Sequence, residues 1–411
     1  MEAIHILTLQ QIKGVGRKTI QRLLDAIDSE VDSTESLHDQ LADVEDKVSR
    51  FRAPDLNSLR SAFQQSIRII EEARNKNIHV LSYRDKAFPP RLRKIPDPPV
   101  LVFVQGDLSS VRREEAVAVI GTRNPTDLGA KVAERLGRIL AEREIAVVSG
   151  LAYGCDIAAH KGCIKETGIG IAVLAHGLDT MYPAAHRGEA EQLIEHGGAL
   201  ITEYPPGFKP NKRSFVERDR LQSGLSRGVI VIETGVKGGT MHTVGFAEKQ
   251  GRKVACFSNN DRNYHNHTSV RGNRRLLESG RALPIGSPED IDRFLSAIEI
   301  SGQVVSNQEE HYSFGKQRPE PSSTSKLDTL SSKHSLSDAQ TRMVKKLITD
   351  GPIQHNSLTG HEPRTANALK RKGVVDEEDG VITLSQNVPD NDENLNMQNA
   401  RMNKNGQLLL I

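Results

Sequence analysis

Apolar and polar positions follow two different rhythms along this chain. In residues 1 to about 80, apolar side chains such as Ile20, Leu23, Leu24 and Ile27 recur every three or four positions, which predicts amphipathic helices. From residue 98 to 300, short apolar runs rich in β-branched residues alternate with helical patterns. Nearly continuous apolar strands are typical of a parallel sheet covered on both faces. The pattern therefore predicts an α/β fold, with a Rossmann-like doubly wound parallel sheet as its core.

Six strands and five intervening helices are expected in this central region. The predicted strands cover residues 116–120, 145–149, 169–175, 199–202, 229–233 and 253–257. The predicted helices cover roughly 128–142, 155–166, 187–196, 216–225 and 240–250.

The ends of the chain have their own patterns. Gly14 and Gly16 separate two helical patterns, which predicts a helix-hairpin-helix whose turn, with Lys13, Arg17 and Lys18, could hold a phosphate; a plain helical hairpin is the alternative. Two helical patterns followed by a strand, a turn and a strand favour a small winged-helix-like domain near the C-terminus. The expected domains are 1–80 (helical), 81–300 (Rossmann-like core), 301–334 (flexible linker), 335–386 (winged-helix-like) and 387–411 (polar, disordered tail).

Composition narrows the class of protein. The 411 residues carry 55 basic and 53 acidic side chains, a net charge of +2, so any anion site must come from a local cluster of charge. Three cysteines without a CxxC pair argue against a disulfide framework or a structural zinc site. No apolar run approaches the roughly 18 residues that span a bilayer. We therefore expect a cytoplasmic protein with no membrane segment.

Glycine-rich turns follow several predicted strands. Gly121 and Arg123 follow the first, Gly150 the second, and Lys237 with Gly238 the fifth. Ligands of open α/β sheets bind beyond the carboxyl ends of the strands, where glycine lets an anion approach backbone N–H groups. Several such turns at one sheet edge favour an anion site over ordinary tight connections.

Nearby side chains suggest what this site would bind. Phe215 could stack on a base while Arg218 and Arg220 pair with phosphates, although a buried phenylalanine beside a solvated charge run is the alternative. The histidines His160, His176 and His242 could each act as a base, but neither a G-x-S-x-G elbow nor a P-loop is present. Asp156, one turn before His160, is expected to pair with it on a helix. We expect no catalytic residues, metal or cofactor, and hence no enzyme.

An ordered set of motifs resembles one known family. The segments VIGTR (119–123), SGLAYGCDIAAH (149–160), AVLAHGLDTMYP (172–183), TEYPPG (202–207) and FVERDR (215–220) resemble the DNA processing protein A family, also called DprA or Smf. Further matches lie at FPPRL (88–92), IPDPPVL (95–101), KGGT (237–240) and GNRRLL (272–277). The resemblance spans nearly the whole chain.

The resemblance implies a single-stranded DNA-binding protein that protects incoming DNA and helps to load a RecA-type recombinase in natural transformation and recombination. It also implies a bacterial homodimer. Carried over by motif, the DNA-binding residues are Gly121, Thr122, Arg123, Gly150, Lys212, Phe215, Arg218, Arg220, Lys237, Gly238, Gly239, Thr240 and Asn273.

The sequence departs from the family pattern at three positions in or near this set. Tyr153 stands where the family usually has arginine, Asp219 where it has asparagine, and Gly238 where it has serine. Asp219 would repel phosphate unless it pairs with Arg218 or Arg220. Two alternatives remain open. The same edge could hold a nucleotide-derived small molecule, sensed or hydrolysed with Glu203 or Glu233 as acid or base. Alternatively, an inert core could carry terminal domains that bind duplex DNA or a partner.

Overall fold

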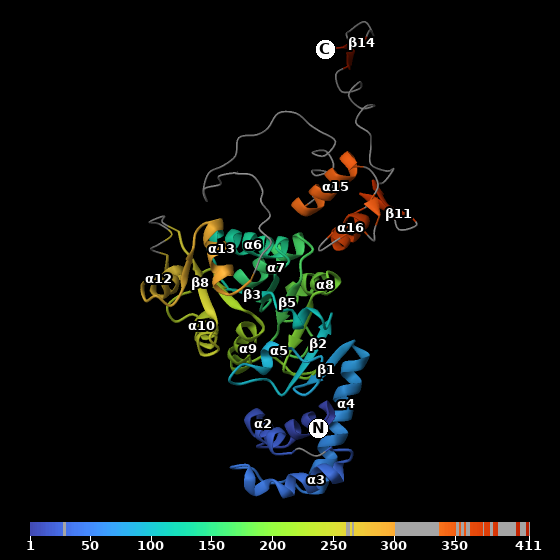
Figure 1. The fold of residues 1–411 in the computed structure, drawn as a ribbon, viewed down its shortest axis with the longest axis vertical. Coiled ribbons are helices and arrows are strands. Elements are labelled where there is room, and N and C mark those ends of the chain that lie inside the picture. Colours follow the sequence, from blue (N-terminus) through green and yellow to red (C-terminus); the bar gives the residue numbers. More distant parts are fainter. Residues whose placement is uncertain are drawn as a thin grey trace. The chain divides into compact units, whose positions relative to one another are not determined.

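The computed structural model describes residues 1–27, 30–259, 264, 267–300, 337–350, 353–354, 357–358, 362–372, 374–378, 381–384, 400–402 and 408–410 (Figure 1). Its contacts divide the chain into two units, Met1–Phe314 and Gly315–Ile411. The expected linker at 301–334 lies outside the described residues. In the part of the chain described, no helix combines the length and apolar character needed to span a membrane.

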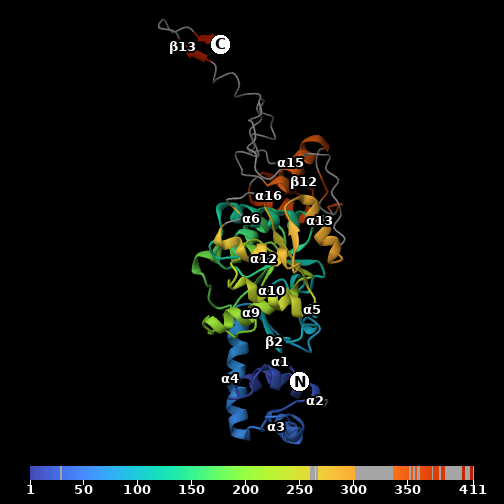
Figure 2. The ribbon, with the colours of Figure 1, turned by 90° about the vertical axis from the view of Figure 1, so that its left-hand side faces the viewer.

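Four helices form the first segment of unit 1, and Figure 2 shows α1, α2 and α3 gathered along α4. Their first turns follow the usual rules: the side chains of Ser33 and Asp55 cap α3 and α4 by accepting hydrogen bonds from Ser36 and Ser58 N–H. The helices are α1 (Ala3–Gln11), α2 (Arg17–Ala26), α3 (Thr34–Asp43) and α4 (Leu56–Asn75), with a short 3₁₀ turn η1 (Glu45–Lys47).

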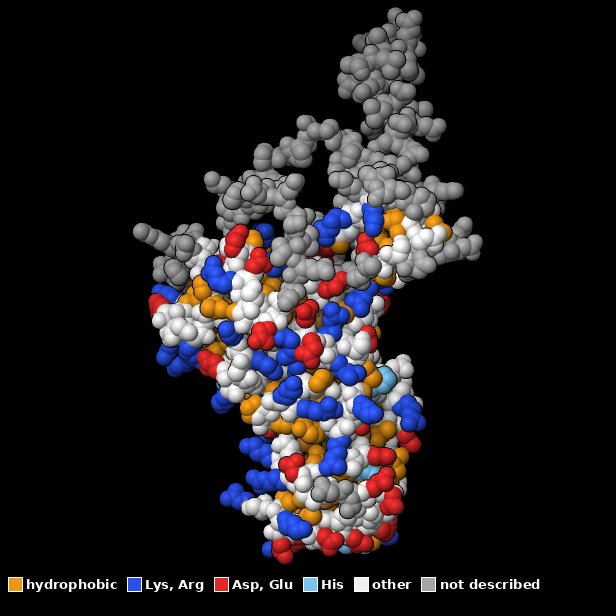
Figure 3. Space-filling view, in the orientation of Figure 1, with side chains coloured by type: hydrophobic (Ala, Val, Ile, Leu, Met, Phe, Trp, Pro, Cys, Tyr) orange, Lys and Arg blue, Asp and Glu red, His pale blue; other side chains and the backbone are white. Residues whose placement is uncertain are grey.

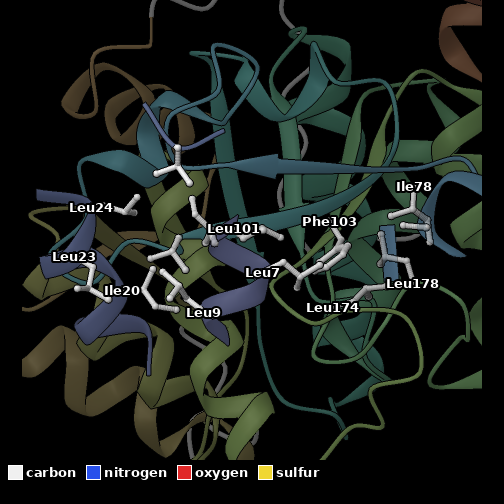
Figure 4. Close-up of a cluster of buried hydrophobic side chains, with 14 of the residues drawn as sticks. Leu7, Leu9, Ile20, Leu23, Leu24, Ile78, Leu101, Phe103, Leu174 and Leu178 are labelled. Carbon is white, nitrogen blue, oxygen red and sulfur yellow. The ribbon is translucent and has the colours of Figure 1, made fainter. Parts of the chain in front are cut away.

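The apolar faces of these helices join the core of the sheet. Leu7 and Leu9 of α1 belong to the same buried cluster as Leu101 and Phe103 of the sheet (Figure 4). These four side chains are fully buried, so each removes apolar surface worth about 1.5–3 kcal/mol from water. The helical segment is thus packed on the core and shares its hydrophobic interior.

A nine-stranded sheet fills the rest of unit 1 in the described residues. Its order is β1-β2-β6-β5-β4-β3-β7-β8-β9. The seven strands β3 to β9 are mutually parallel, whereas β2 is antiparallel to both of its neighbours, β1 and β6. The strands are β1 (Ile78–Ser82), β2 (Leu101–Gly106), β3 (Ala116–Ile120), β4 (Ala146–Ser149), β5 (Gly170–Val173), β6 (Ala199–Thr202), β7 (Gly228–Val231), β8 (Lys253–Phe257) and β9 (Leu283–Ile285). The expected α/β class, with a largely parallel sheet, is confirmed.

Both faces of the central strands are buried. Along β3, Val117 and Val119 contact the cluster of α6, α7 and α13, whereas Ala118 and Ile120 contact that of α5, α9, α10 and α12. This explains the continuous apolar runs in the sequence. The covering helices are α5 (Pro90–Arg93), α6 (Asp127–Glu142), α7 (Cys155–Lys165), α8 (Arg187–Glu195), α9 (Lys212–Leu225), α10 (Thr240–Lys249), α12 (Arg271–Glu278) and α13 (Pro288–Ala297), with 3₁₀ turns η2 (Ser110–Arg112), η3 (Ala184–His186) and η4 (Thr268–Val270).

Unit 2 has a small core of its own, in which Val344, Leu347, Leu369 and Ile382 are buried together. Its described elements are α15 (Asp338–Asp350), β10 (Ile353–Gln354), α16 (Glu362–Arg371), β11 (Val375–Glu378) and β12 (Val381–Leu384), the strands forming an antiparallel sheet in the order β10-β12-β11. The winged-helix assignment stays a prediction. Within the expected disordered tail, β13 (Ala400–Met402) and the apolar β14 (Leu408–Leu410) form an antiparallel pair.

Candidate nucleic-acid interface

A cavity of about 410 Å³ lies at the carboxyl ends of β3 and β7, and is called here the carboxyl-edge cavity. The chain proceeds from β3 to β4, β5 and β6 on one side of β3, and then to β7, β8 and β9 on the other. The boundary between β3 and β7 is therefore the topological switch point, where open α/β sheets bind ligands. The lining residues are Ile120, Gly121, Thr122, Arg123, Ala152, Asp156, Phe215, Val216, Arg218, Asp219, Gln222, Thr234, Gly235, Gly238, Gly239, Thr240, His242 and Thr243.

An aromatic side chain and a cation face each other in this cavity. The guanidinium carbon of Arg123 lies 4.9 Å from the centre of the Phe215 ring. The Tyr182 ring, half exposed, lies beside Phe215 with centroids 5.9 Å apart. Arg123 comes from the loop after β3, while Phe215 sits in the first turn of α9, further inside the helix than the sequence pattern predicted. Together they offer a stacking surface beside a positive charge.

Buried polar groups form the floor of the cavity. Arg218 is 5% exposed; its Nη1 donates to the carbonyl oxygen of Val173 at 2.8 Å. Its Nε lies 3.3 Å from Oδ1 of Asp219, so the expected pairing of this acidic residue is found with Arg218. Asp156 accepts a hydrogen bond from the backbone N–H of Gly150 at 3.1 Å. The expected Asp156–His160 pair is wrong, because the Asp156 carboxylate turns toward Gly150 and Arg218.

Burial changes the titration of both carboxyl groups in the floor. It raises the pKa of Asp219 to about 7, with the Arg218 guanidinium opposing the shift and the Asp156 carboxylate adding to it. Burial likewise raises the pKa of Asp156, again opposed by Arg218. The charge of the cavity therefore depends on pH near neutrality.

Two glycines are required by this packing. A Cβ on Gly150 would lie 1.7 Å from Nη1 of Arg218 and 2.6 Å from Oδ2 of Asp156. Gly154 starts α7 with φ at +81°, and a Cβ there would lie 2.4 Å from the carbonyl oxygen of Thr122. Glycine at these turns thus keeps the floor compact under the loop that carries Arg123.

Five expected site residues lie outside the cavity lining. Lys212 and Lys237 are exposed, and Lys237 adjoins the lining residue Gly238. Gly150 is buried behind Arg218. Asn273 is buried and fixes the loop after β7, because its side chain accepts from Thr234 N–H at 2.8 Å and donates to the carbonyl of Ile232 at 2.7 Å.

Arg220 is the fifth expected site residue outside the cavity lining, and it forms an ion pair within the protein. It is 2% exposed and donates to both carboxylate oxygens of Glu203, at 2.5 and 2.6 Å. Arg17 of α2 joins this cluster through Asp97 and lies 3.6 Å from Glu203. Sequence reasoning had placed both arginines against phosphate. The structure places them in an ion-pair cluster that holds α2 against the core.

The two glutamates considered as acid or base, Glu203 and Glu233, and the strand-end Ser149 are engaged in structural contacts. Glu233 is buried and accepts hydrogen bonds from the backbone N–H and hydroxyl of Thr126, at 2.9 and 2.6 Å. Ser149 donates its hydroxyl to the carbonyl of Val119 at 2.6 Å. Neither Glu203 nor Glu233 lines the carboxyl-edge cavity.

Several side chains at the cavity were missed from the sequence. Gln222 lies one turn after Asp219 on α9, and its place could have been found from helical spacing. Tyr182 belongs to the loop after β5, which the strand-end rule could have included. Charge on the surface gives no guide here: in Figure 3 Lys and Arg are mixed with Asp and Glu, and acidic side chains gather near α3.

Comparison with known proteins places this site in a family. The model of the family described as "DNA recombination-mediator protein A" matches residues 79–296, which include every strand-end loop of the cavity. The chain belongs to this family. The resemblance inferred from the motifs is thereby confirmed.

Relatives in the family match part of their length. Protein Smf of Synechocystis sp. is 33% identical over 264 residues, 63% of this chain and 65% of that protein. A putative DNA processing protein DprA of Mycobacterium tuberculosis is 40% identical over 188 residues, 46% of this chain and 47% of that protein. The chain therefore spans less than two thirds of the length of these relatives. The X-ray structure of DNA processing protein A from Streptococcus pneumoniae matches with a TM-score of 0.58 and 29% identity, covering 71% of this chain and 98% of that one.

Proposed function

We propose that the chain binds single-stranded DNA in the carboxyl-edge cavity. The observation that carries this proposal is Arg123 lying 4.9 Å over Phe215 inside a cavity at the sheet's switch point. A base can stack on the Phe215 ring while its phosphate meets Arg123, a mode of holding strands that is independent of base sequence. Exposed Lys212 and Lys237 extend the positive charge along the strand.

Phosphate groups are received by backbone as well as by side chains. The N–H groups of Gly239 and Thr240, at the start of α10, would meet an anion at the positive end of the helix dipole, whereas the N–H of Gly238 donates to the carbonyl of Gly235 at 3.1 Å. Thr122 and Thr240 add hydroxyl donors at the same rim. Arg218 gives charge from the floor, partly neutralised by Asp219.

Single strands are favoured over duplex because Phe215 is half-buried within the cavity. A base can reach that ring only after it has unpaired and unstacked from its neighbours. In a duplex this step costs free energy that a single strand does not lose. We propose binding without catalysis. The DNA would be held for protection and for transfer to a RecA-type recombinase by a cytoplasmic homodimer, with the domain division given by the sequence.

A second candidate is a mononucleotide-like ligand. A volume of about 410 Å³ lies in the range of small-molecule pockets, and the stacking ring and cation would suit a nucleotide equally well. This candidate predicts that a free mononucleotide competes at concentrations near its own dissociation constant.

The test is fluorescence anisotropy of a labelled single strand with the full chain, across salt, beside a matched duplex and a mononucleotide competitor. We expect salt-steep binding that prefers the single strand and resists the mononucleotide. Phe215→Leu should weaken binding by about 1–3 kcal/mol through lost stacking. Equal affinity for duplex, or displacement by mononucleotide at its own dissociation constant, would contradict the proposal.

A further inference from the structure

A second cavity, of about 390 Å³, lies at the opposite ends of the same strands and is called here the amino-edge cavity. It is distinct from the carboxyl-edge cavity, with which it shares no lining residue. Its lining residues are Arg91, Lys94, Glu114, Arg227, Gly251, Arg252, Lys253, Ala297, Ile298 and Glu299.

The sheet register explains why these residues meet. Val117 of β3 pairs with Gly228 of β7, and Gly228 pairs with Lys253 of β8. The residues just before these strands therefore lie side by side, and Arg227 N–H donates to the carbonyl of Ala116 at 2.8 Å. Arg252 occupies the equivalent place before β8, while Arg91 reaches the same edge from α5.

Positive charge exceeds negative charge in this cavity. Five cations, Arg91, Lys94, Arg227, Arg252 and Lys253, stand against two carboxylates, Glu114 and Glu299. Both carboxylates are mainly in solvent, with their side chains 64% and 91% exposed. Their contribution is therefore screened by water and salt.

The arginines of this cavity differ in how many of their N–H groups have a partner. Arg91 and Arg227 donate to Glu114 and to backbone carbonyls at the rim. The Nε atoms of Arg91 and Arg252 are buried, and neither has a hydrogen-bond partner among the described residues. Burial and then the nearby charges of Arg91 and Arg227 lower the pKa of Arg252. A buried donor without a partner is costly, and an anion in the cavity would remove that cost.

We propose that the amino-edge cavity is a second anion site, which binds the phosphate groups of a phosphorylated ligand. None of the described residues that line the cavity is aromatic, so it would recognise phosphate without contacting a base. Guanidinium groups match phosphate oxygens in charge and geometry, and several phosphates together would neutralise the excess of cations. The source of the phosphate is either a free polyphosphorylated molecule or the backbone of a long nucleic-acid strand.

The test is isothermal titration of the full chain with inorganic tripolyphosphate. All proteins in this experiment carry Arg123→Gln, which weakens anion binding in the carboxyl-edge cavity. Arg252→Gln should lower tripolyphosphate affinity about tenfold, since it removes a buried charge-assisted contact. Lys94→Gln, at an exposed position where folding is not at risk, should lower it about threefold. The matched control is Lys76→Gln, an exposed lysine just after α4, which should leave affinity unchanged.

Stability separates a binding role of Arg252 from a structural one. Because its Nε has no partner, Arg252→Gln should keep or raise the urea midpoint of the ligand-free protein, and should lose the rise that tripolyphosphate gives the parent. Affinity unchanged in both Arg252→Gln and Lys94→Gln would overturn the proposal. A single strand of roughly 40 nucleotides then identifies the source: weaker binding in Arg252→Gln indicates a nucleic-acid backbone, and unchanged binding indicates a free phosphorylated ligand.

Discussion

The carboxyl-edge and amino-edge cavities lie at opposite ends of β3 and β7, and the arginines beside them differ in their partners. Beside the first, Arg220 is matched by both oxygens of Glu203, and Arg218 by Asp219 and a backbone carbonyl. At the second, Arg252 has no carboxylate partner among the described residues; its Nε is buried without a hydrogen-bond partner, as is the Nε of both Arg218 and Arg220. Among the described lining residues, an aromatic ring faces a cation in the first cavity and none lines the second. The difference indicates that an arginine with a carboxylate partner stabilises the fold, whereas an arginine without one is available to a bound anion.

The largest expected effect is on stability, and it tests the ion pair between Arg220 and Glu203. Arg220→Ala should lower the free energy of unfolding by about 3–5 kcal/mol, because it leaves Glu203 buried without its main partner. Urea denaturation measures this change. The exposed Lys249→Gln on α10 serves as control and should be within about 0.5 kcal/mol of the parent. A loss of under 1 kcal/mol for Arg220→Ala would mean that the Arg220–Glu203 pair does not stabilise the fold.

The next effect tests the floor of the carboxyl-edge cavity. Gly150→Ala places a Cβ 1.7 Å from Nη1 of Arg218, so we expect a loss of about 1–3 kcal/mol in stability together with weaker DNA binding. Gly239→Ala is the matched control, since no atom lies within 4 Å of its Cβ, and its unfolding free energy should hardly change. Equal stability of the two variants in denaturant would contradict the close packing.

A smaller effect concerns Asp219, which lines only the carboxyl-edge cavity. Burial raises its pKa from 3.8 to about 7, so below pH 7 the folded protein keeps a proton that the unfolded chain has lost. Stability therefore falls as pH rises from about 4 to 7, and Asp219→Asn should reduce that fall, leaving the part that comes from the raised pKa of Asp156.

The same titration acts on DNA. Above pH 7 the ionised carboxylate repels phosphate, so affinity should fall, by about tenfold, between pH 6 and 8 in the parent and fall clearly less in Asp219→Asn. Anisotropy at constant salt gives both curves. Parallel pH profiles for the two proteins would remove Asp219 from the interface.

The smallest effect concerns exposed Lys237. Lys237→Gln should reduce the slope of log affinity against log salt by about 0.7, the value for one phosphate contact on a single strand. The Arg252→Gln variant is the comparison and should keep the parent slope with a short oligonucleotide, which cannot reach the opposite edge of the sheet. Identical slopes for Lys237→Gln and the parent would place Lys237 away from the strand.

Much of the fold could be predicted because local pattern determines it. The six strands β3 to β8 are found within a few residues of their predicted bounds, since each is buried on both faces and reads as an apolar run. The outer strands β1 and β2 at one side of the sheet and β9 at the other were not predicted. The antiparallel direction of β2 depends on pairing with β6, which lies about 100 residues away in the sequence.

The sequence predicted those site residues whose place depends on the local backbone. It did not predict those whose place depends on pairing between distant side chains. Glycine turns at strand ends indicated Gly121 and Gly238 correctly as lining residues. The partner of Arg220 could not be inferred, because Glu203 belongs to another loop and only the packed fold brings them together. The amino-edge cavity was invisible for the same reason: Arg91, Arg227 and Arg252 come from distant segments that the register aligns.

The central claim is that Arg123 and Phe215 hold single-stranded DNA at the carboxyl edge. The most direct measurement is the salt dependence of single-strand binding by Arg123→Gln, beside Lys249→Gln, which changes a cation at the far end of α10. The account predicts a slope flatter by about 0.7 and weaker binding for Arg123→Gln alone. A slope equal to that of the parent would show that the strand is bound elsewhere.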